Sequence, residues 1–431
     1  MNNPASPSQT PMSFFLTKEA MNRVRRRKAA DLRLRLYGLV AIGLAVAMLA
    51  TLFVSLIMTG YPSFVQTHVT LDVYLDPADI EADSPETGNY RAVIKESLLT
   101  LFPEVKNPRQ QRALQGLISN GAQYMLRDEV TANPRLIGQT VSLKVPATDM
   151  VDQLHKGVIS RQLPEDQRKI SDQQIAWYDA LAASGRITAP FNWALFFNSD
   201  SRFPELAGLK GAIAGSFYAL AVCFLISFPA GIAAAIYLEE FAARNKITDF
   251  IEVNINNLAA IPSVVFGLLG LALFLQFMGL PRSAPLVGGI VLSLMTLPTI
   301  IIATRVALKA VPPSIREAAL GLGASRQQVV FHHVLPLSLP GVMTGAIIGL
   351  ARALGETAPL LLIGMNAFIT SDPGGLMDPA TALPTQIFIW ADSPERGFAA
   401  RTSAAILVLI GFLLVMNITA IILRQRFERK W

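Results

Sequence analysis

An arginine and a glutamate interrupt an otherwise apolar stretch, Gly341–Met365, which is long enough to cross a membrane. Arg352 and Glu356 are four residues apart, so they share one face of the predicted helix. Each charge costs roughly 2.5–3.5 kcal/mol to insert at a helix centre, and pairing offsets only part of that cost. A guanidinium holds an oxyanion through two parallel hydrogen bonds. The spacing favours an anion path formed by Arg352, Glu356 and Thr357, against the alternative of a charge pair that only fixes helix packing.

Three glycines lie on the same helix face as this pair, at Gly341, Gly345 and Gly349. A row of small residues lets a second helix approach closely. We therefore expect a helix seam along this face, with both charges well inside the membrane.

A second pattern occupies the loop Lys309–Pro340, which follows another apolar stretch. Ser314 is predicted to cap a short helix that carries Glu317 in its first turn. Gly323 lies in the break after this helix, and Ser325 starts another one. Two short helices joined by a glycine turn would form a compact knob, whereas the alternative is an ordinary amphipathic loop.

Composition places most of the 431 residues in a membrane, because 52% are hydrophobic and only 16% are charged. Soluble chains carry about 25% charged residues. Six stretches are apolar over the roughly 20 residues that cross a bilayer in a helix. They are Tyr37–Met58, Gly211–Tyr237, Ile255–Met278, Ala284–Ile302, Gly341–Met365 and Thr402–Leu423. The expected fold class is an all-α polytopic membrane protein with about six transmembrane helices.

Basic residues set the orientation of these spans. Arg23–Lys28, Arg33 and Arg35 precede the first span, and Arg424 and Arg426 follow the last. The positive-inside rule therefore predicts a multi-pass membrane protein with both termini in the cytoplasm. A cleaved signal peptide is the less favoured alternative, because the first apolar run is longer than a signal h-region. The net charge of +6 lies beside apolar spans and does not indicate nucleic-acid binding.

The block between the first two spans is predicted to be a small extracytoplasmic α+β domain. Alternating apolar and polar residues indicate strands at Thr67–Asp76 and Gln139–Val145. Amphipathic helices are expected at Tyr90–Leu101, Arg109–Leu126 and Ser171–Ala183. The block from Tyr61 to Glu205 carries 18 acidic and 14 basic residues, so we expect it not to bind free phosphate tightly. The single cysteine excludes an internal disulfide, and it shows no metal-ligand spacing with the four histidines.

The predicted organisation has five parts. They are a basic cytoplasmic tail at 1–36, a transmembrane helix at 37–59, a periplasmic domain at 60–207, a five-helix membrane core at 208–427 with a cytoplasmic loop at 309–340, and a cytoplasmic C-terminus at 428–431.

The loop also carries a recognisable motif. Glu317-Ala318-Ala319, Gly323 and Leu335-Pro336 resemble the EAA motif, the cytoplasmic signature of permease subunits of ATP-binding-cassette (ABC) importers. His333 departs from the motif, since the family usually has an aliphatic residue there. The resemblance implies a type I ABC importer permease core in which these six residues couple transport to an ATPase.

A closer resemblance begins at Arg352. The segment Arg352–Pro359 looks like the characteristic segment of phosphate-specific ABC permeases, and so do Ile261–Gly267 and Leu383–Ile387. The likeness runs from about Pro204 to the C-terminus. The chain resembles the PstA-type permease family, in its longer form with an extra N-terminal region. This implies a subunit that moves inorganic phosphate across the inner membrane.

The resemblance also implies partners. They are a second homologous permease subunit, a cytoplasmic ABC ATPase dimer and a periplasmic phosphate-binding protein, with membrane lipid around them. The chain contains no G-x-x-x-x-G-K-[ST] phosphate loop, so ATP hydrolysis is expected from the partner. We expect no catalytic site, cofactor or metal in this chain.

Other functions remain open at the level of residues. Physics alone does not separate phosphate from sulfate or molybdate. A membrane sensor is a rival because a folded block between two helices is a common receptor layout, although the chain has no cytoplasmic output module. An ion channel or proton-coupled carrier could use the charge pair but would not need the loop motif. A membrane enzyme is least favoured, because His332 and His333 have no ligand partners at suitable spacing.

Overall fold

The computed structural model describes residues 18–80 and 84–427 of the chain. It divides into two compact units, Met1–Met58 and Thr59–Trp431, which we describe separately. The predicted C-terminal segment 428–431 and the first 17 residues of the predicted tail lie outside the described residues.

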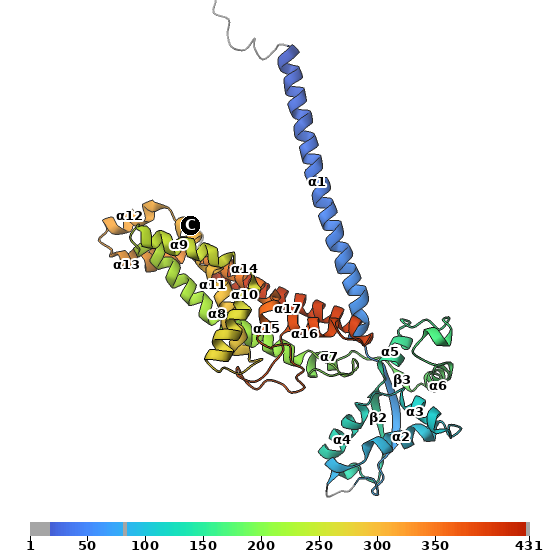
Figure 1. Ribbon diagram of the computed structural model, residues 1–431. Coiled ribbons are helices and arrows are strands. Elements are labelled where there is room, and N and C mark those ends of the chain that lie inside the picture. The colour runs from blue at the N-terminus through green and yellow to red at the C-terminus, as the bar shows by residue number, and fades with distance from the viewer. Residues whose placement is uncertain (1–17, 81–83, 428–431) are drawn as a thin grey trace, which may run out of the picture. The chain divides into compact units, whose positions relative to one another are not determined.

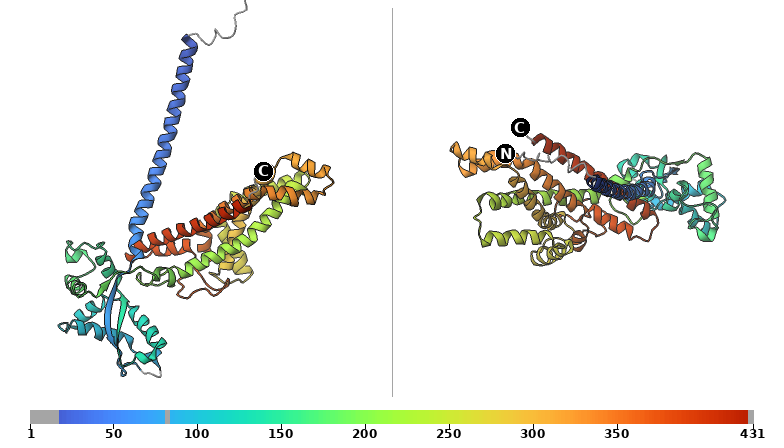
Figure 2. Two further views of the ribbon diagram at one scale, coloured as in Figure 1. Left: turned by 180° about the vertical axis from the view of Figure 1, so that it is seen from behind. Right: turned by 90° about the horizontal axis from the view of Figure 1, so that it is seen from above.

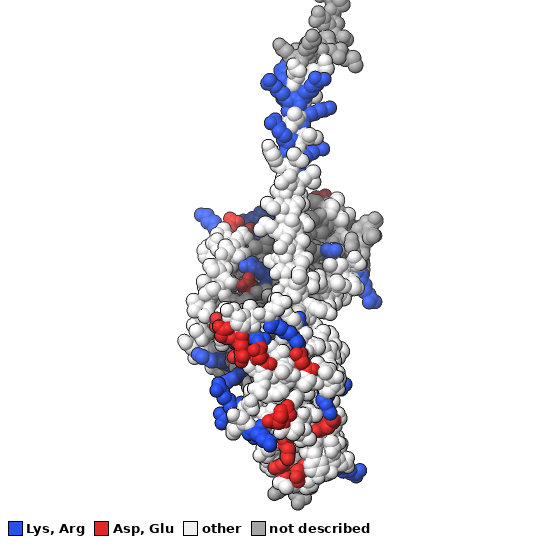
Figure 3. All heavy atoms as spheres, turned by 90° about the vertical axis from the view of Figure 1, so that its right-hand side faces the viewer, with Lys and Arg blue, Asp and Glu red and all other residues white. Residues whose placement is uncertain are grey.

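The first unit consists of most of one long helix, α1 (Lys18–Gly60). The basic segment and the apolar segment are continuous in it, so the described part of the predicted tail, 18–36, is helical. Arginine, lysine, alanine and leucine dominate this segment, and all four are strong helix formers. Figure 3 shows the basic side chains gathered at one end of α1 and an uncharged surface along the rest.

The second unit begins with a small α+β domain built on a three-stranded antiparallel sheet (Figure 1). The strand order is β2 (Thr140–Pro146), β1 (His68–Tyr74), β3 (Ile187–Thr188). Alternate side chains of β1 are fully buried, as the sequence pattern predicted. The two predicted strands are confirmed. The third has only two residues, too short to produce a period-2 pattern.

Helices surround this sheet. Two predicted helices are confirmed as α2 (Tyr90–Leu101) and α6 (Asp172–Ala183). The predicted helix Arg109–Leu126 is wrong, because residues 116–121 separate α3 (Pro108–Gln115) from α4 (Ala122–Ala132). Gly116 and Gly121 flank this break, and glycine is a poor helix former. The remaining elements are α5 (Asp149–His155), α7 (Ala194–Phe197) and 3₁₀ turns at Tyr61–Phe64, Pro85–Thr87, Pro134–Leu136 and Glu165–Gln167.

Long apolar helices form the rest of the second unit. They are α8 (Lys210–Ile236), α11 (Pro285–Lys309), α14 (Leu335–Gly355) and α17 (Gly397–Phe427), with shorter helices α15 (Ala358–Leu362) and α16 (Leu383–Ala391). A π-helical turn, Tyr237–Phe241, extends α8. Among the described residues, five helices including α1 are long and apolar enough to cross a membrane, and one bent pair makes a sixth candidate.

That bent pair replaces the predicted straight span Ile255–Met278. It consists of α9 (Lys246–Ala259) and α10 (Ser263–Leu269), which continues as a π-helix to Phe277, and the two halves meet at 101°. The bend falls at Pro262, because proline disfavours helical backbone at the residue before it.

The core helices pack side by side through glycine contacts (Figure 1, Figure 2). Gly289 of α11 lies against Val222 of α8, and Gly231 of α8 lies against Ile300, so these two helices run in the same direction. The glycines of α14 meet α11 in the opposite sense, since Gly341 faces Ala307 and Gly349 faces Thr296. A methyl group added at Gly341 or Gly349 would lie 2.6 or 2.8 Å from these side chains. The α14 seam is therefore a contact within this chain.

Gly345→Ala should destabilise the packing of α14 against α11 by about 1–3 kcal/mol, because the new methyl group would overlap the Ala303 side chain. Adding Ala303→Gly should restore most of the lost stability. Gly411→Ala is the matched control, since no atom lies within 4 Å of its added carbon. The measurement is urea unfolding in detergent, and equal effects at Gly345 and Gly411 would contradict the seam.

Candidate functional site

The predicted anion-path residues lie where α14 ends. The helix stops at Gly355, Glu356 has extended backbone dihedrals, and Thr357 precedes the short helix α15. The predicted span through Met365 is therefore wrong beyond Gly355. Pro359 explains the position of the break, because its ring would clash with the carbonyl group of Gly355 in a continuous helix.

Arg352 and Glu356 nonetheless remain neighbours. Their closest atoms, Arg352 Nε and Glu356 Oε1, are 3.5 Å apart. The Arg352 side chain is 46% exposed and that of Glu356 is 19% exposed. The guanidinium is thus accessible from outside the packed core, while adjacent Ala353 and Leu354 are buried in it.

The contacts of α14 with α11 give the position of the pair along the core. The contacts of Gly341, Gly345 and Gly349 step along α11 from Ala307 towards Thr296. Continuing this antiparallel register carries Arg352 to the first third of α11, near the end that starts at Pro285. The pair therefore lies between the centre of α11 and the end that starts at Pro285.

The predicted knob has the expected two-helix form. Its helices are α12 (Pro313–Gly321) and α13 (Arg326–Gln328), and a π-helix (Val329–Val334) leads from α13 into α14. Gly323 has a φ of +88°, a conformation that side chains with a Cβ rarely adopt. Ser325 starts α13 with a capping box completed by Gln328. Ser314 is not the cap of α12, because the helix starts one residue earlier at Pro313, which is favoured at a first helical position.

The motif residues of the knob divide between its two sides. Ala319 is buried among apolar residues from the ends of α8 and α11, whereas Glu317 and Ala318 are exposed. Leu335 and Pro336 are half-buried in the first turn of α14. Leu322, beside the glycine turn, is 91% exposed. The knob therefore has an anchored side and an exposed side.

An ion pair that sequence reasoning missed fixes the anchored side. Arg316 donates to the Glu240 carboxylate at 2.7 Å and to the carbonyl oxygens of Val311 and Leu308 at 2.7 and 2.9 Å. Glu240 belongs to the π-turn that ends α8. The only signal in the sequence was the adjacent pair Glu239-Glu240 at the end of an apolar span.

A second ionic group binds the bent segment to the same end of the core. Arg305 of α11 contacts Glu252 of α9 at 2.5 Å and Glu239 at 3.4 Å, and Lys309 also contacts Glu239 at 3.4 Å. These pairs hold the end of α8, α9 and α11 together next to the knob.

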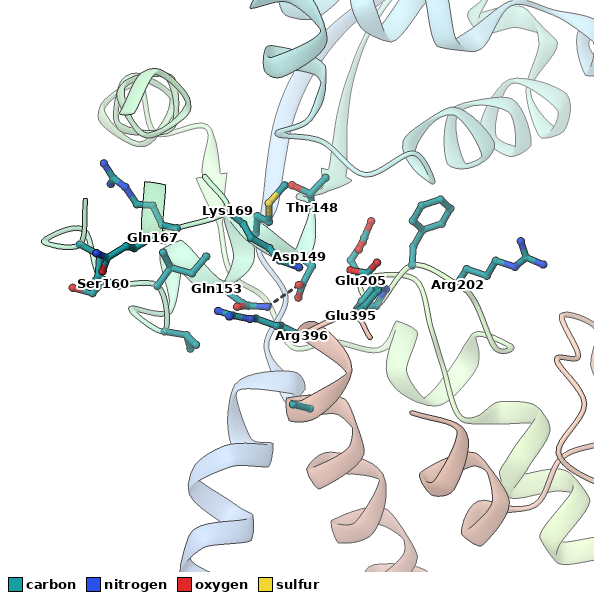
Figure 4. Close-up of a pocket in the computed structure, with 18 of the residues that line it drawn as sticks. Thr148, Asp149, Gln153, Ser160, Gln167, Lys169, Arg202, Glu205, Glu395 and Arg396 are labelled. Atoms are coloured by element: carbon teal, nitrogen blue, oxygen red, sulfur yellow. Dashed lines mark hydrogen bonds between the residues drawn. The ribbon is translucent and has the colours of Figure 1, made fainter. Parts of the chain in front are cut away.

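Buried carboxyl groups gather where the small domain meets the start of α17. They border a cavity of about 1000 Å³ (Figure 4). Glu205 accepts a hydrogen bond from Ser119 at 2.7 Å, and Asp149 accepts one from Gln153 at 2.6 Å. Burial raises the pKa of both carboxyl groups, and these hydrogen bonds offset only part of that effect. Arg401 of α17, also buried, donates to the carbonyl oxygen of Ala207 at 2.5 Å.

Glu205→Gln should stabilise this junction more as the pH rises. When the pKa of a glutamate is raised in the folded state, the folded protein loses stability as the pH rises from the ordinary pKa, near 4.5, through the folded pKa. Glutamine mimics the protonated form of the side chain, so the variant does not lose this stability. The difference in Tm between variant and wild type should be near zero below pH 4.5 and should grow above it. A difference that is constant with pH would contradict the raised pKa. Glu104→Gln, at an exposed position of the same domain, is the control.

Two family models match separate parts of the chain. Residues 227–431 match the family described as binding-protein-dependent transport system inner membrane component, and residues 21–165 match a domain of unknown function, DUF3333. The second match ends before α6 and β3, which belong to the same structural domain.

Individual relatives share the C-terminal half. The probable ABC transporter permease protein YqgI of Bacillus subtilis is 32% identical over 49% of this chain and 76% of its own length. The phosphate transport system permease protein PstA of Yersinia pestis is 34% identical over 49% of this chain and 71% of its own. Among solved structures, the MetNI methionine ABC transporter in an inward-facing conformation aligns with 52% of this chain and 95% of its own, at 19% identity and a TM-score of 0.39.

The family match at 227–431 includes the helix break, the seam and the knob. Both of these curated relatives are more than 30% identical to the chain over more than two thirds of their own length. The chain is therefore a multi-pass membrane protein that belongs to the PstA-type permeases, within the binding-protein-dependent inner membrane components of ABC transporters.

Proposed function

We propose that this chain is the transmembrane permease subunit of an ATP-driven importer of inorganic phosphate. The observation that carries the proposal is the half-exposed Arg352 at the end of α14, in a chain whose relatives include phosphate transport system permease proteins. The same relatives favour phosphate over sulfate or molybdate, and they favour a transporter over a sensor.

The helix break supports a water-accessible path. Backbone polar groups freed at membrane depth must be buried in protein or must face a water-filled cavity. At this break the side chains of Ala353 and Leu354 face the core, while Arg352 is exposed. An anion that leaves water needs a charge to replace its hydration, and a guanidinium does so through bidentate hydrogen bonds. Glu356 weakens this hold, because it competes for the guanidinium and repels the anion, and Thr357 adds a hydroxyl group beside it.

Coupling to ATP hydrolysis belongs to the exposed side of the knob. Glu317, Ala318, Leu320 and Leu322 are all exposed there. A movement of the exposed side is transmitted to α8 and α11 through the contacts of Ala319 and through the Arg316–Glu240 ion pair. We infer that a cytoplasmic ABC ATPase dimer docks here and supplies the hydrolysis, so this chain is not itself an enzyme.

The remaining partners and the orientation follow from the same assignment. A second homologous permease subunit would close the path around Arg352, and a periplasmic phosphate-binding protein would deliver the anion. The knob then faces the cytoplasm, and both termini lie on that side of the inner membrane. The domain at 60–207 would then lie on the periplasmic side, because α8 begins directly after it and ends beside the knob.

Arg352→Gln should lower phosphate uptake by about a hundredfold, since a bidentate charged contact contributes about 3 kcal/mol. Arg352→Lys should restore little, because an ammonium lacks the planar fork. Uptake of labelled phosphate by proteoliposomes of the assembled complex is the measurement. Arg282→Gln, outside the long helices, is the matched control.

The double variant Arg352→Gln with Glu356→Gln separates the path from a merely structural pair. Removing both charges relieves any packing problem but leaves no cation in the path. Uptake should therefore stay low in the double variant, and full recovery would refute the role of Arg352.

Gly323→Ala should uncouple the knob, because alanine at a φ of +88° costs about 1–2 kcal/mol in the left-handed region. Gly321→Ala is the control. At both glycines the added Cβ would have no atom within 4 Å, and of the two only Gly323 has a positive φ. We expect phosphate uptake per ATP hydrolysed to fall in Gly323→Ala alone, while the subunit still inserts. Equal coupling in the two variants would exclude the glycine turn from docking.

A further inference from the structure

A cavity of about 340 Å³ in the small domain has a basic lining. Arg91 and Lys95 of α2 and Arg112 of α3 border it, and none of its lining residues is acidic. Arg91 and Lys95 are four residues apart, so they project from the same face of α2. The local charge is thus opposite in sign to the net charge of −4 between Tyr61 and Glu205. The expectation that this block does not bind free phosphate tightly concerned its overall charge and stays a prediction.

These three cations have no carboxylate partner in the part of the chain that the structure describes. Several other basic residues of the domain are paired, among them Arg127 with Asp128 and Arg161 with Asp179. Three unpaired cations around one cavity repel each other, and a bound anion would reduce that repulsion.

Neutral hydrogen-bond donors complete the lining. The side-chain amides of Gln115, Asn120 and Gln123 border the cavity. Ala122 and Gln123 of the first turn of α4 also border the cavity, and the Ala122 N–H donates to the carbonyl oxygen of Ser119. A helix N-terminus carries a partial positive charge. Cationic and amide donors therefore converge on one space.

The floor of the cavity is apolar and its size exceeds that of a bare ion. Ile94, Leu98 and Ile118 are buried side chains that border it. A volume near 340 Å³ lies at the small end of the range of ligand pockets, about 300–1,000 Å³. The combination fits a small molecule with at least two negative charges and some apolar surface.

We propose that this cavity binds a soluble small molecule that carries a phosphoryl or comparable oxyanion group. The site lies in the small domain and uses none of the residues of the Arg352 path or the knob. It shares Asn120 and Thr148 with the larger cavity at the junction with α17, so an occupant would contact residues that border both. The proposal does not depend on what the membrane core transports.

The test uses the full chain in nanodiscs of neutral lipid, with inorganic pyrophosphate as the probe. Hydrogen exchange followed by mass spectrometry should slow in α2 and in residues 116–123, and its dose dependence gives the dissociation constant. Arg91→Gln combined with Arg112→Gln should weaken binding about a hundredfold or more, at roughly tenfold for each lost charged hydrogen bond. Arg109→Gln, exposed on α3 but outside the lining, should change binding less than about twofold.

Three outcomes would overturn the proposal. One is unchanged exchange in these segments at millimolar pyrophosphate. Another is equal weakening by the control Arg109→Gln. The third is protection in nanodiscs of anionic lipid without added pyrophosphate, which would assign the site to a lipid headgroup. Exchange of β1 reports whether each variant is folded, and the single variant Lys95→Gln replaces the double variant if that one unfolds.

Discussion

Close packing of α14 against α11 determines where both functional regions of the core lie. Three glycines of α14 let its backbone approach side chains of α11 such as Ala303. In lipid there is little hydrophobic gain from helix association, so van der Waals contact between small residues provides much of the attraction. The contact fixes α14 along its length. One end of α14 then carries Arg352 and the other continues into the knob.

Two prolines set the boundaries of the segments at the two ends of α14. Pro359 forces the chain out of helical conformation just after Arg352, and Pro313 starts the knob at the other side of the core. The break leaves polar backbone groups that only water or protein can satisfy. The knob in turn is joined to α8 by the Arg316–Glu240 pair. Movement of the knob can therefore reach the helix that carries the arginine through packed contacts.

The small domain has a different physical basis. Its core is formed by side chains between Val69 and Leu181, separate from the apolar clusters of the membrane helices. It meets those helices through polar groups, including the buried Glu205 and Arg401 and the half-buried Asp149. Such groups are costly to bury unless they are hydrogen-bonded, so they make the junction specific to one arrangement.

The sequence by itself determined the class of protein, most of the spans and both strands of the longer pair, and it predicted the residues of the path and the knob. These depend on hydropathy, period-2 alternation and local backbone rules, which act within a few residues. It did not place the bend at Pro262 inside a predicted span, the helix end at Gly355, or Pro313 as the start of α12. There, proline and glycine competed with a strong apolar pattern.

Only the tertiary structure decided which distant residues meet. The pairing of Arg316 with Glu240 spans the bent segment, and the basic cavity collects Arg91 from α2 and Arg112 from α3. Net charge averages over a whole domain, whereas a binding site depends on the charges within a few ångströms. The physical reason is that local patterns fix elements, but long-range packing fixes the distances between their side chains.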